Sequence, residues 1–264
     1  MIVALNVGNT HIAHGIVDGG ELKSTGRAPT PGEDATFKLE MLLDEILGNG
    51  GGATDGLEII VASVVPHVTA ALSELSERRG FRLIVADETT IPLPARVGSA
   101  ATAGHDRLVN AFAAARIHGT PVIVVDLGTA TTFEIVAADG SFLGGAIAPG
   151  VGLGLDALAS RTALLPRTPI VLPPRAIGRN TVEAIQSGTV MGHVGMVSYL
   201  IRAVSAELGV SGGGAPKVVL TGGLSAHAWA RAIPGVDAID PLLTLRGLAL
   251  LYDELAGARS VTSA

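Results

Sequence analysis

One phrase occurs twice in this chain, and it limits the possible folds more than any other feature of the sequence. Residues 4–17 read ALNVGNTHIAHGIV and residues 124–136 read VVDLGTATTFEIV. Each copy starts with an apolar run typical of a buried strand, breaks at a glycine, and continues with a second strand-like run. Asp18-Gly19-Gly20 and Asp139-Gly140 then follow the two copies and predict a hairpin into a third strand.

The segments that follow each copy also repeat in order. In the first half we predict strands at 2–7, 11–17, 21–27, 57–65 and 81–87, with helices at 33–48 and 67–80. In the second half we predict strands at 121–127, 130–137, 141–148 and 217–223, with helices at 153–165, 181–208, 225–233 and 243–257. This order favours an α/β fold of two related domains with mixed sheets, residues 1–118 and 119–264. The alternative is a chance recurrence of a strand-turn-strand phrase.

Composition excludes several classes of function. The 264 residues are 48% apolar and carry a net charge of −6 without any basic run, so we expect a large core and no nucleic-acid binding. There is no cysteine, which excludes disulfides and thiol chemistry. No apolar stretch approaches the roughly 18 residues of a membrane span. The start MIVALNV lacks a basic segment, so we expect no signal peptide, no membrane and a cytoplasmic location.

The glycine turns suit phosphate. A tight turn such as Gly8-Asn9-Thr10 can align backbone N–H groups and a hydroxyl toward phosphate oxygens. A carboxylate at the end of the preceding strand can hold a metal ion beside them. One such turn also fits an ordinary hairpin, but two in matching positions predict a clamp on the phosphates of ATP. The phrase VVLTGG at 218–223 would let adenosine approach the backbone, or simply ends a strand.

Several longer phrases are shared with one family. They are NVGNTHIAHG (6–15), GHDRLVNAFAA (104–114), VVDLGTATTFEIV (124–136), GGAIAPGV (144–151), IGRNTVEAIQSGTVMGHVGMV (177–197) and LTGGL (220–224). On these phrases the chain resembles the type III pantothenate kinases, which belong to the actin-, hexokinase- and sugar-kinase-like ATPase superfamily.

The resemblance implies a fold and an activity. The fold would be two ribonuclease H-like (actin-like ATPase) domains with mixed sheets and a nucleotide cleft between them. The activity would be phosphorylation of the 4′-hydroxyl of pantothenate by ATP, the first step of coenzyme A synthesis. The resemblance further implies Mg²⁺ with the ATP, a monovalent cation (K⁺ or NH₄⁺), and a homodimer with its substrate sites near the subunit interface.

Site residues follow from the same phrases. The expected ATP-binding residues are Asn6, Val7, Gly8, Asn9, Thr10, His11, Thr129, Gly222 and Gly223. Asp126 matches the residue that holds the monovalent cation. Asp106 in GHDR is the expected general base, although an aspartate there could also cap the helix that follows. Arg107 could hold the pantothenate carboxylate through two parallel hydrogen bonds, or form a surface ion pair.

Three further residues complete the expected substrate site. Gly104 would allow the substrate to approach the backbone closely. His105 stands where the family usually has alanine, and it could hydrogen-bond the substrate, crowd it, or point away. Thr181 matches a threonine that contacts pantothenate, and its alternative role is the N-cap of the long helix.

Two departures from the family pattern leave a second function open. Asn6 replaces the usual aspartate, and the loss of its charge could weaken metal binding or transition-state stabilisation. The segment ARVGSAATA before GHDR lacks the family's tyrosine. The alternative is therefore a catalytically weakened homologue that binds nucleotide or pantothenate as an accessory or regulatory protein. A sugar kinase is a further alternative, but no sugar-binding phrase supports it.

Overall fold

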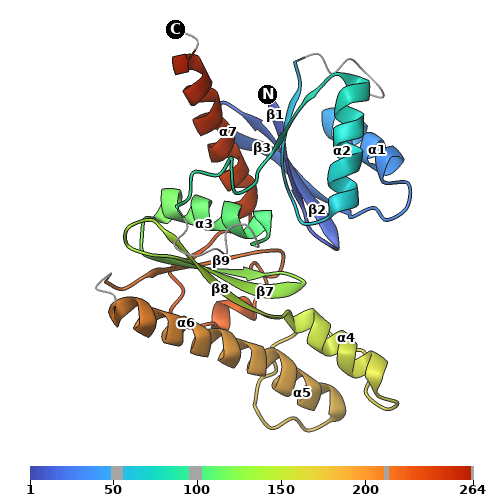
Figure 1. The fold of residues 1–264 in the computed structure, drawn as a ribbon. Helices are drawn as coiled ribbons and strands as arrows, with labels where there is room; N and C mark the ends of the chain where they lie inside the picture. The colour runs from blue at the N-terminus through green and yellow to red at the C-terminus, as the bar shows by residue number, and fades with distance from the viewer. Residues whose placement is uncertain (49–55, 95–102, 211–213, 263–264) are drawn as a thin grey trace. The chain divides into compact units, whose positions relative to one another are not determined.

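The chain forms two compact units, each built on one five-stranded sheet. The computed structural model describes residues 1–48, 56–94, 103–210 and 214–262 (Figure 1). Unit 1 holds Met1–Leu93, Gly98–Ala113 and Leu243–Ala264, and unit 2 holds Pro94–Val97 and Ala114–Leu242. This division differs from the two predicted ranges chiefly at the C-terminal helix α7 (Leu243–Thr262), which belongs to unit 1.

The sheet of unit 1 has the strand order β3-β2-β1-β4-β5. Its strands are β1 (Ile2–Val7), β2 (His11–Asp18), β3 (Glu21–Pro29), β4 (Glu58–Ser63) and β5 (Arg82–Val85). The first three strands are antiparallel neighbours, whereas β4 and β5 run parallel to β1. The predicted hairpin at residues 18–20 is confirmed, and Gly19 and Gly20 both take the positive φ angles that such a turn requires.

The sheet of unit 2 repeats this topology strand for strand. Its strands are β6 (Val122–Leu127), β7 (Ala130–Val136), β8 (Phe142–Pro149), β9 (Lys217–Thr221) and β10 (Ala238–Ile239), in the order β10-β9-β6-β7-β8. Even the β-bulge recurs, between Ile16 and Val17 in β2 and between Ile135 and Val136 in β7. The repeated phrase therefore marks a repeated fold and not a chance recurrence.

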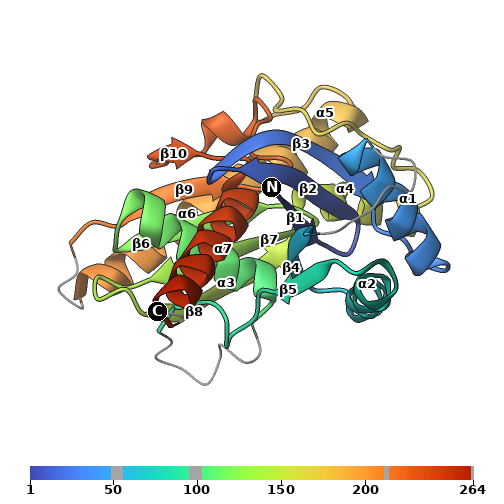
Figure 2. The ribbon, with the colours of Figure 1, turned by 90° about the horizontal axis from the view of Figure 1, so that it is seen from above.

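Helices cover both faces of the first sheet. α1 (Ala35–Leu47) and α2 (Pro66–Arg79) lie on one face and α7 on the other (Figures 1 and 2). Alternate residues of β1, namely Val3, Leu5 and Val7, join the core beneath α1 and α2. Because side chains alternate along a strand, the residues between them face away from that core. A strand covered on both faces reads as a continuous apolar run, as β1 does.

In unit 2 a second core forms between the sheet and its helices. α4 (Val151–Arg161) and α6 (Gly192–Val210) contribute Val151, Val197 and Ile201 to it (Figure 1). The predicted helix at 181–208 is continuous in the chain but mixed in type. It comprises α5 (Thr181–Gln186), a π-helical segment (Ser187–Met191) and α6.

Two helix predictions were wrong in part. The helix predicted at 153–165 ends at Arg161. The helix predicted at 225–233 is a series of tight turns with a single 3₁₀ segment, Ala230–Ala232. There the Ser225 hydroxyl and N–H both donate to the Gly222 carbonyl, and such short-range hydrogen bonds compete with an α-helix. Within the described part of the chain, no helix combines the length and apolar character needed to cross a membrane.

Close packing of α7 on α3 (His105–His118) depends on one glycine. A Cβ atom at Gly247 would lie 2.8 Å from both Val109 Cγ1 and Ala113 Cβ, and 3.0 Å from the Val109 carbonyl oxygen. Beside this contact the buried Thr244 hydroxyl donates to Asn110 Oδ1 over 2.7 Å. The two helices can approach this closely only because position 247 has no side chain.

We expect Gly247→Ala to lower the free energy of unfolding by about 1–3 kcal/mol, because the added methyl group overpacks this contact. Gly257→Ala in the same helix is the matched control, since nothing lies within 4 Å of a Cβ there. The control should be neutral or stabilising by about 0.4–1 kcal/mol through helix propensity. Urea denaturation of both variants measures the difference, and equal effects would contradict the packing argument.

Candidate active site

Asn6 lies at the carboxyl end of β1 on the face opposite the α1–α2 core. Its Oδ1 atom is buried and has no hydrogen-bond partner among the described residues. Buried polar atoms are nearly always hydrogen-bonded, so an exception of this kind calls for an explanation. A bound ligand or the hydration shell of a metal ion would satisfy it.

The turn after Asn6 is stabilised by a hydrogen bond within the turn and by Thr30, the residue that follows β3. The Gly8 N–H donates to the His11 carbonyl over 3.0 Å, and the Thr30 hydroxyl donates to the Gly8 carbonyl over 2.6 Å. The Gly8 N–H is therefore used inside the turn and is not available to a phosphate. Asn9, Thr10 and His11 are exposed and are the residues of this turn that a ligand can reach. Val7 is buried in the core and can contribute only its backbone.

The corresponding turn of unit 2 has the same design. The Gly128 N–H donates to the Ala130 carbonyl, and the Gly150 N–H donates to the Thr129 carbonyl, each over 3.0 Å. Thr129 is exposed at the tip of the turn. As in unit 1, the turn exposes a threonine, here Thr129, close to a polar residue near the end of the preceding strand, here Asp126.

Asp126 is enclosed by the end of β9. Gly222 has a φ of 88°, and a Cβ atom on it would overlap the Asp126 carboxylate. Thr221 is the register partner of Asp126 on β9, is 1% exposed, and its Oγ1 has no hydrogen-bond partner among the described residues. Sequence analysis missed Thr221, although a threonine that ends a buried strand before two glycines was a usable signal. Gly223, next in the chain, is exposed.

Asp106 lies in the first turn of α3. The helix begins at His105, and the N–H groups of Arg107 and Leu108 donate to the Gly104 carbonyl. Asp106 is therefore inside the helix, and the alternative that it is the N-cap of a helix starting at Leu108 was wrong. The Arg107 N–H also donates to Asp106 Oδ1 over 2.8 Å. Burial raises the pKa of the Asp106 carboxyl above its ordinary value, against the opposing effects of that hydrogen bond and of Arg107 and His105.

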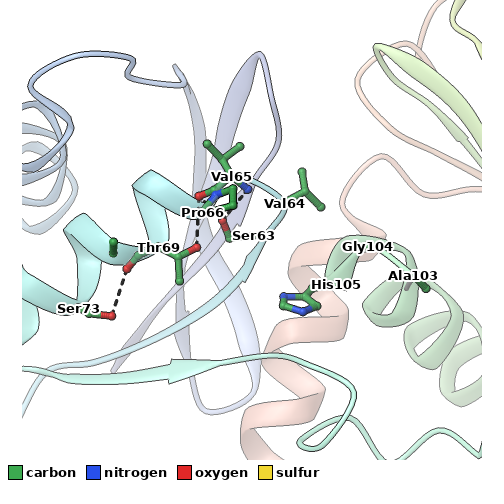
Figure 3. Close-up of a pocket in the computed structure, with 10 residues that line it drawn as sticks. Ser63, Val64, Val65, Pro66, Thr69, Ser73, Ala103, Gly104 and His105 are labelled. Carbon is green, nitrogen blue, oxygen red and sulfur yellow. Dashed lines mark hydrogen bonds between the residues drawn. The ribbon is translucent and has the colours of Figure 1, made fainter. Parts of the chain in front are cut away.

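Gly104 is needed at its position for packing. A Cβ atom there would lie 2.7 Å from Asp106 Oδ1 and 3.1 Å from Val64 Cγ1. Gly104 and His105 also line a pocket of about 510 Å³ that extends to the β4–α2 turn (Figure 3). The GHDR phrase thus places a half-buried carboxylate next to two residues that line a pocket of ligand size.

Thr181 begins α5, but the helix is capped by its neighbour. Asn180 Oδ1 accepts a hydrogen bond from the Glu183 N–H, and the Glu183 carboxylate accepts one from the Arg179 N–H, each over 2.9 Å. The arrangement is a variant of the capping box, in which Glu183 accepts from the residue before the N-cap and not from the N-cap itself. The alternative N-cap role of Thr181 was therefore wrong. Thr181 itself is exposed.

Comparison with known proteins decides the family. The family model described as type III pantothenate kinase matches residues 2–203. A type III pantothenate kinase of Moorella thermoacetica is 39% identical over 256 residues, which cover 96% of this chain and 99% of the relative. The chain belongs to the type III pantothenate kinase family.

Comparison with solved structures shows the fold. A Campylobacter jejuni protein named as a Baf family transcriptional activator matches with a TM-score of 0.62 at 19% identity, over 97% of this chain and 99% of its own. MreB 5 of Spiroplasma citri, bound to AMPPNP, matches with a TM-score of 0.57 at 11% identity, over 99% and 98%. The prediction of an actin-like ATPase fold is confirmed.

The family's motifs fall into separate places in the two units. Unit 1 holds the Asn6–His11 turn and the GHDR phrase, and unit 2 holds Thr129, Asp126 with Gly222, and Thr181. The departure from the type III pantothenate kinase pattern at ARVGSAATA concerns residues 95–103, of which only Ala103 lies within the described residues. Arg107 is half-buried at the start of α3.

We expect Gly222→Ala to destabilise the protein by more than Gly140→Ala does. Both glycines have positive φ angles, 88° and 83°, so both substitutions carry the same backbone strain of about 1 kcal/mol or more. Only at position 222 would the methyl group also strike the Asp126 carboxylate, since nothing lies within 4 Å of a Cβ at Gly140. Thermal unfolding of the two variants measures the difference, and equal shifts in Tm would contradict the close approach.

Proposed function

We propose that this protein transfers the γ-phosphoryl group of ATP to the 4′-hydroxyl of pantothenate, the first step of coenzyme A synthesis. Family membership over nearly the whole chain supports a kinase of this type. The observation that carries the proposal is Asp106, a half-buried carboxyl with a raised pKa next to Gly104 and His105, which line a pocket of ligand size. Phosphoryl transfer requires little covalent chemistry from the protein, only positioning and charge neutralisation.

Asp106 acts as the general base in this proposal. Its carboxylate accepts the proton of the 4′-hydroxyl as that oxygen attacks the γ-phosphorus, while the bond from the γ-phosphorus to the β,γ-bridging oxygen breaks and ADP leaves. A raised pKa makes a carboxylate a stronger base, and it places the group nearer to the range where proton transfer is efficient. The Arg107 N–H bond fixes one oxygen of the carboxylate and thereby its orientation. The guanidinium of Arg107 would hold the carboxylate end of pantothenate.

ATP would bind through the two strand-linked turns. Asn9, Thr10, His11 and Thr129 would face the phosphates, and Gly222 and Gly223 would let the adenosine lie close to the backbone. Oxygen ligands suit Mg²⁺, and Asn6 supplies a buried amide oxygen without a described partner. Mg²⁺ bound with ATP neutralises charge that develops on the phosphates. The described residues hold no cluster of three or more His, Asp or Glu side chains that could enclose a metal ion.

The monovalent cation would lie at Asp126. The carboxylate there and the buried Thr221 hydroxyl, its register partner, form a pair of hard oxygen ligands of the kind K⁺ requires. Thr221 extends the cation site beyond the residue predicted from the sequence.

The protein would act as a cytoplasmic homodimer with its substrate site near the subunit interface. Thr181 is exposed, and two large apolar side chains close to it in the sequence, Ile177 at 83% and Val182 at 37%, are exposed as well. Apolar side chains grouped on a surface are typical of a protein–protein contact. Such a contact would bring Thr181 next to a second subunit.

Asp106→Asn should lower the rate of phosphopantothenate formation by about 10²–10⁴-fold, because the amide cannot accept the hydroxyl proton. The same variant should have a higher Tm than wild type at neutral pH, because it removes a charge that partial burial disfavours while keeping the oxygen that accepts from the Arg107 N–H. The folded-state pKa of Asp106 is raised, so wild type loses stability as pH rises from the ordinary carboxyl pKa through the folded value. The Tm difference should therefore shrink toward acid pH.

The control for this experiment is Asp253→Asn, the same chemical change at an exposed position of α7. It should alter neither rate nor Tm. Retention of wild-type turnover by Asp106→Asn would rule out the proposed base, and a lower Tm at neutral pH would contradict the burial argument.

Asn6→Asp should restore a carboxylate at the end of β1 and lower the Mg²⁺ concentration needed for half-maximal rate, by about tenfold or more. Without ligands the variant should have a lower Tm than wild type at neutral pH. It places a negative charge at a buried position where the oxygen of Asn6 has no hydrogen-bond partner among the described residues. Mg²⁺ with ATP should reverse that loss. Titration of the rate and of Tm with Mg²⁺ measures both effects. An unchanged Mg²⁺ dependence would show that position 6 does not act on the metal.

A further inference from the structure

A buried histidine joins α6 to the strand that follows the Thr129 turn. His193 is the second residue of α6, and its Nε2 atom is hydrogen-bonded to the Thr131 hydroxyl over 3.0 Å. Both side chains are buried, and Thr131 follows Thr129 by two residues in β7. Burial lowers the pKa of His193, so the ring is neutral at neutral pH. The hydrogen bond therefore connects the start of β7 to the helix behind the sheet.

The same histidine contacts the segment that follows Gly222 and Gly223. The rings of His193 and Trp229 meet edge to face, with their centroids 5.7 Å apart and their planes at 79°. Trp229 is buried and belongs to the series of tight turns that begins at Gly222. Ring pairs in this arrangement attract each other by more than their buried area alone provides. His193 thus contacts a residue of β7 on one side and a residue of these turns on the other.

Backbone contacts join the same two segments elsewhere and complete a closed ring. Thr131 is the register partner of Leu127 at the end of β6. The Leu127 carbonyl accepts a hydrogen bond from the Leu224 N–H over 3.0 Å. Backbone hydrogen bonds of successive tight turns continue from Leu224 to Trp229. The side chain of His193 closes this ring between Trp229 and Thr131.

The ring of contacts lies on the helix-covered face of the sheet of unit 2. Leu127 and Phe133 belong to the core beneath α6, and side chains alternate along a strand, so Thr131 points into the same core. Asp126 therefore points to the opposite face. His193 lies behind the strands that carry the proposed ATP-binding residues, and it can act on ATP only through the segments that it contacts.

This contact is costly if its only task is packing. The core around it is apolar, and the Trp229 Nε1 atom is buried without a hydrogen-bond partner among the described residues. Polar atoms in such a core lower stability unless they are hydrogen-bonded. The π-helical segment Ser187–Met191 directly before α6 is a further irregularity, and such segments are frequent at functional sites. Together these features indicate a role beyond packing.

We propose that His193 is a positioning residue for ATP. It joins Thr131 to Trp229. It thereby keeps the Thr129 turn and the Gly222–Gly223 segment at the spacing that the phosphates and the adenosine require. The inference deepens the proposed function and rests on it, since ATP is taken to bind these two segments. Binding groups that are held in place before the ligand arrives give higher affinity, because less order has to be created on binding.

The first test compares wild type, His193→Phe and His193→Gln. Phenylalanine keeps an aromatic ring against Trp229 but loses the hydrogen bond to Thr131, whereas the amide of glutamine can reach the place of Nε2 and keep it. We expect His193→Phe to raise the Kd of ATP with Mg²⁺ in calorimetry, and the KM for ATP, by about five- to tenfold. The pantothenate Kd and kcat should change little. His193→Gln should recover most of the loss.

The second test removes the same hydrogen bond from its other end. Thr131→Val should weaken ATP binding by the same factor as His193→Phe, and the double variant should bind ATP no more weakly than either single variant. Ile201→Val is the matched control, because Ile201 lies two turns further along α6 in the same core. The control should lower Tm by creating a small cavity and leave the ATP Kd unchanged.

The outcomes separate this inference from the proposed function. If wild type does not bind ATP, the proposed function fails and the inference fails with it. If wild type binds ATP but does not phosphorylate pantothenate, the proposed function fails alone, and the ATP Kd values still decide the role of His193.

Four results would overturn the role of His193 in a wild type that binds ATP. They are wild-type ATP binding by folded His193→Phe, an equal loss of ATP and pantothenate affinity in that variant, no recovery in folded His193→Gln, and an equal loss in Ile201→Val. If His193→Phe does not fold, Thr131→Val decides, and an unchanged ATP Kd in that variant overturns the role.

Discussion

Burial of one strand on both faces is the constraint on which each unit depends. β1 and β6 lie at the centre of their sheets, so nearly every side chain along them must be apolar. Such a strand can carry a polar side chain only near its end, and Asn6 and Asp126 lie near the carboxyl ends of β1 and β6. The turns, the glycines and the register partner Thr221 gather at the same ends because the strands β4 and β9 run parallel to β1 and β6. Ligands of open α/β sheets bind at the carboxyl ends of strands for the same reason.

The two copies share a backbone but have diverged in charge. Both turns use the glycine N–H internally, and both sheets carry the same bulge. Position 126 has a carboxylate and position 6 an amide, and a buried charge is the more costly of the two to maintain without a partner. The divergence therefore changes the electrostatics of the site without requiring any change of fold. For this reason the fold and the family can be assigned even though Asn6 departs from the aspartate that is usual in the family.

The start of α3 combines three tasks in three consecutive residues. Gly104 makes room for the Asp106 carboxylate, His105 lines the pocket, and Asp106 is half-buried next to them. Successive residues of a helix point in directions about a third of a turn apart, so one short phrase can serve packing, the lining of a pocket and proton transfer together. The close crossing of α7 at Gly247 fixes the helix that carries them.

Local pattern in the sequence predicted most of the elements, the two hairpins and the repeat, because hydrophobic alternation and turn glycines act over a few residues. It failed at residues 225–233, where short-range hydrogen bonds to the Gly222 carbonyl form tight turns in place of the predicted helix. It also failed where partners lie elsewhere in the chain, since α7 packs with the first sheet although it follows the second in sequence. Only the tertiary structure showed that the Thr30 hydroxyl donates to the turn at Gly8 and that Asn180, not Thr181, caps α5. It also showed that Asn6, Thr221 and His105 each have a buried polar atom without a hydrogen-bond partner among the described residues. The sequence by itself determined the fold class, the family and the residue types at the site. Which hydrogen bonds those residues already use was decided by tertiary contacts, since a donor or acceptor is available to a ligand only if the folded chain has not satisfied it.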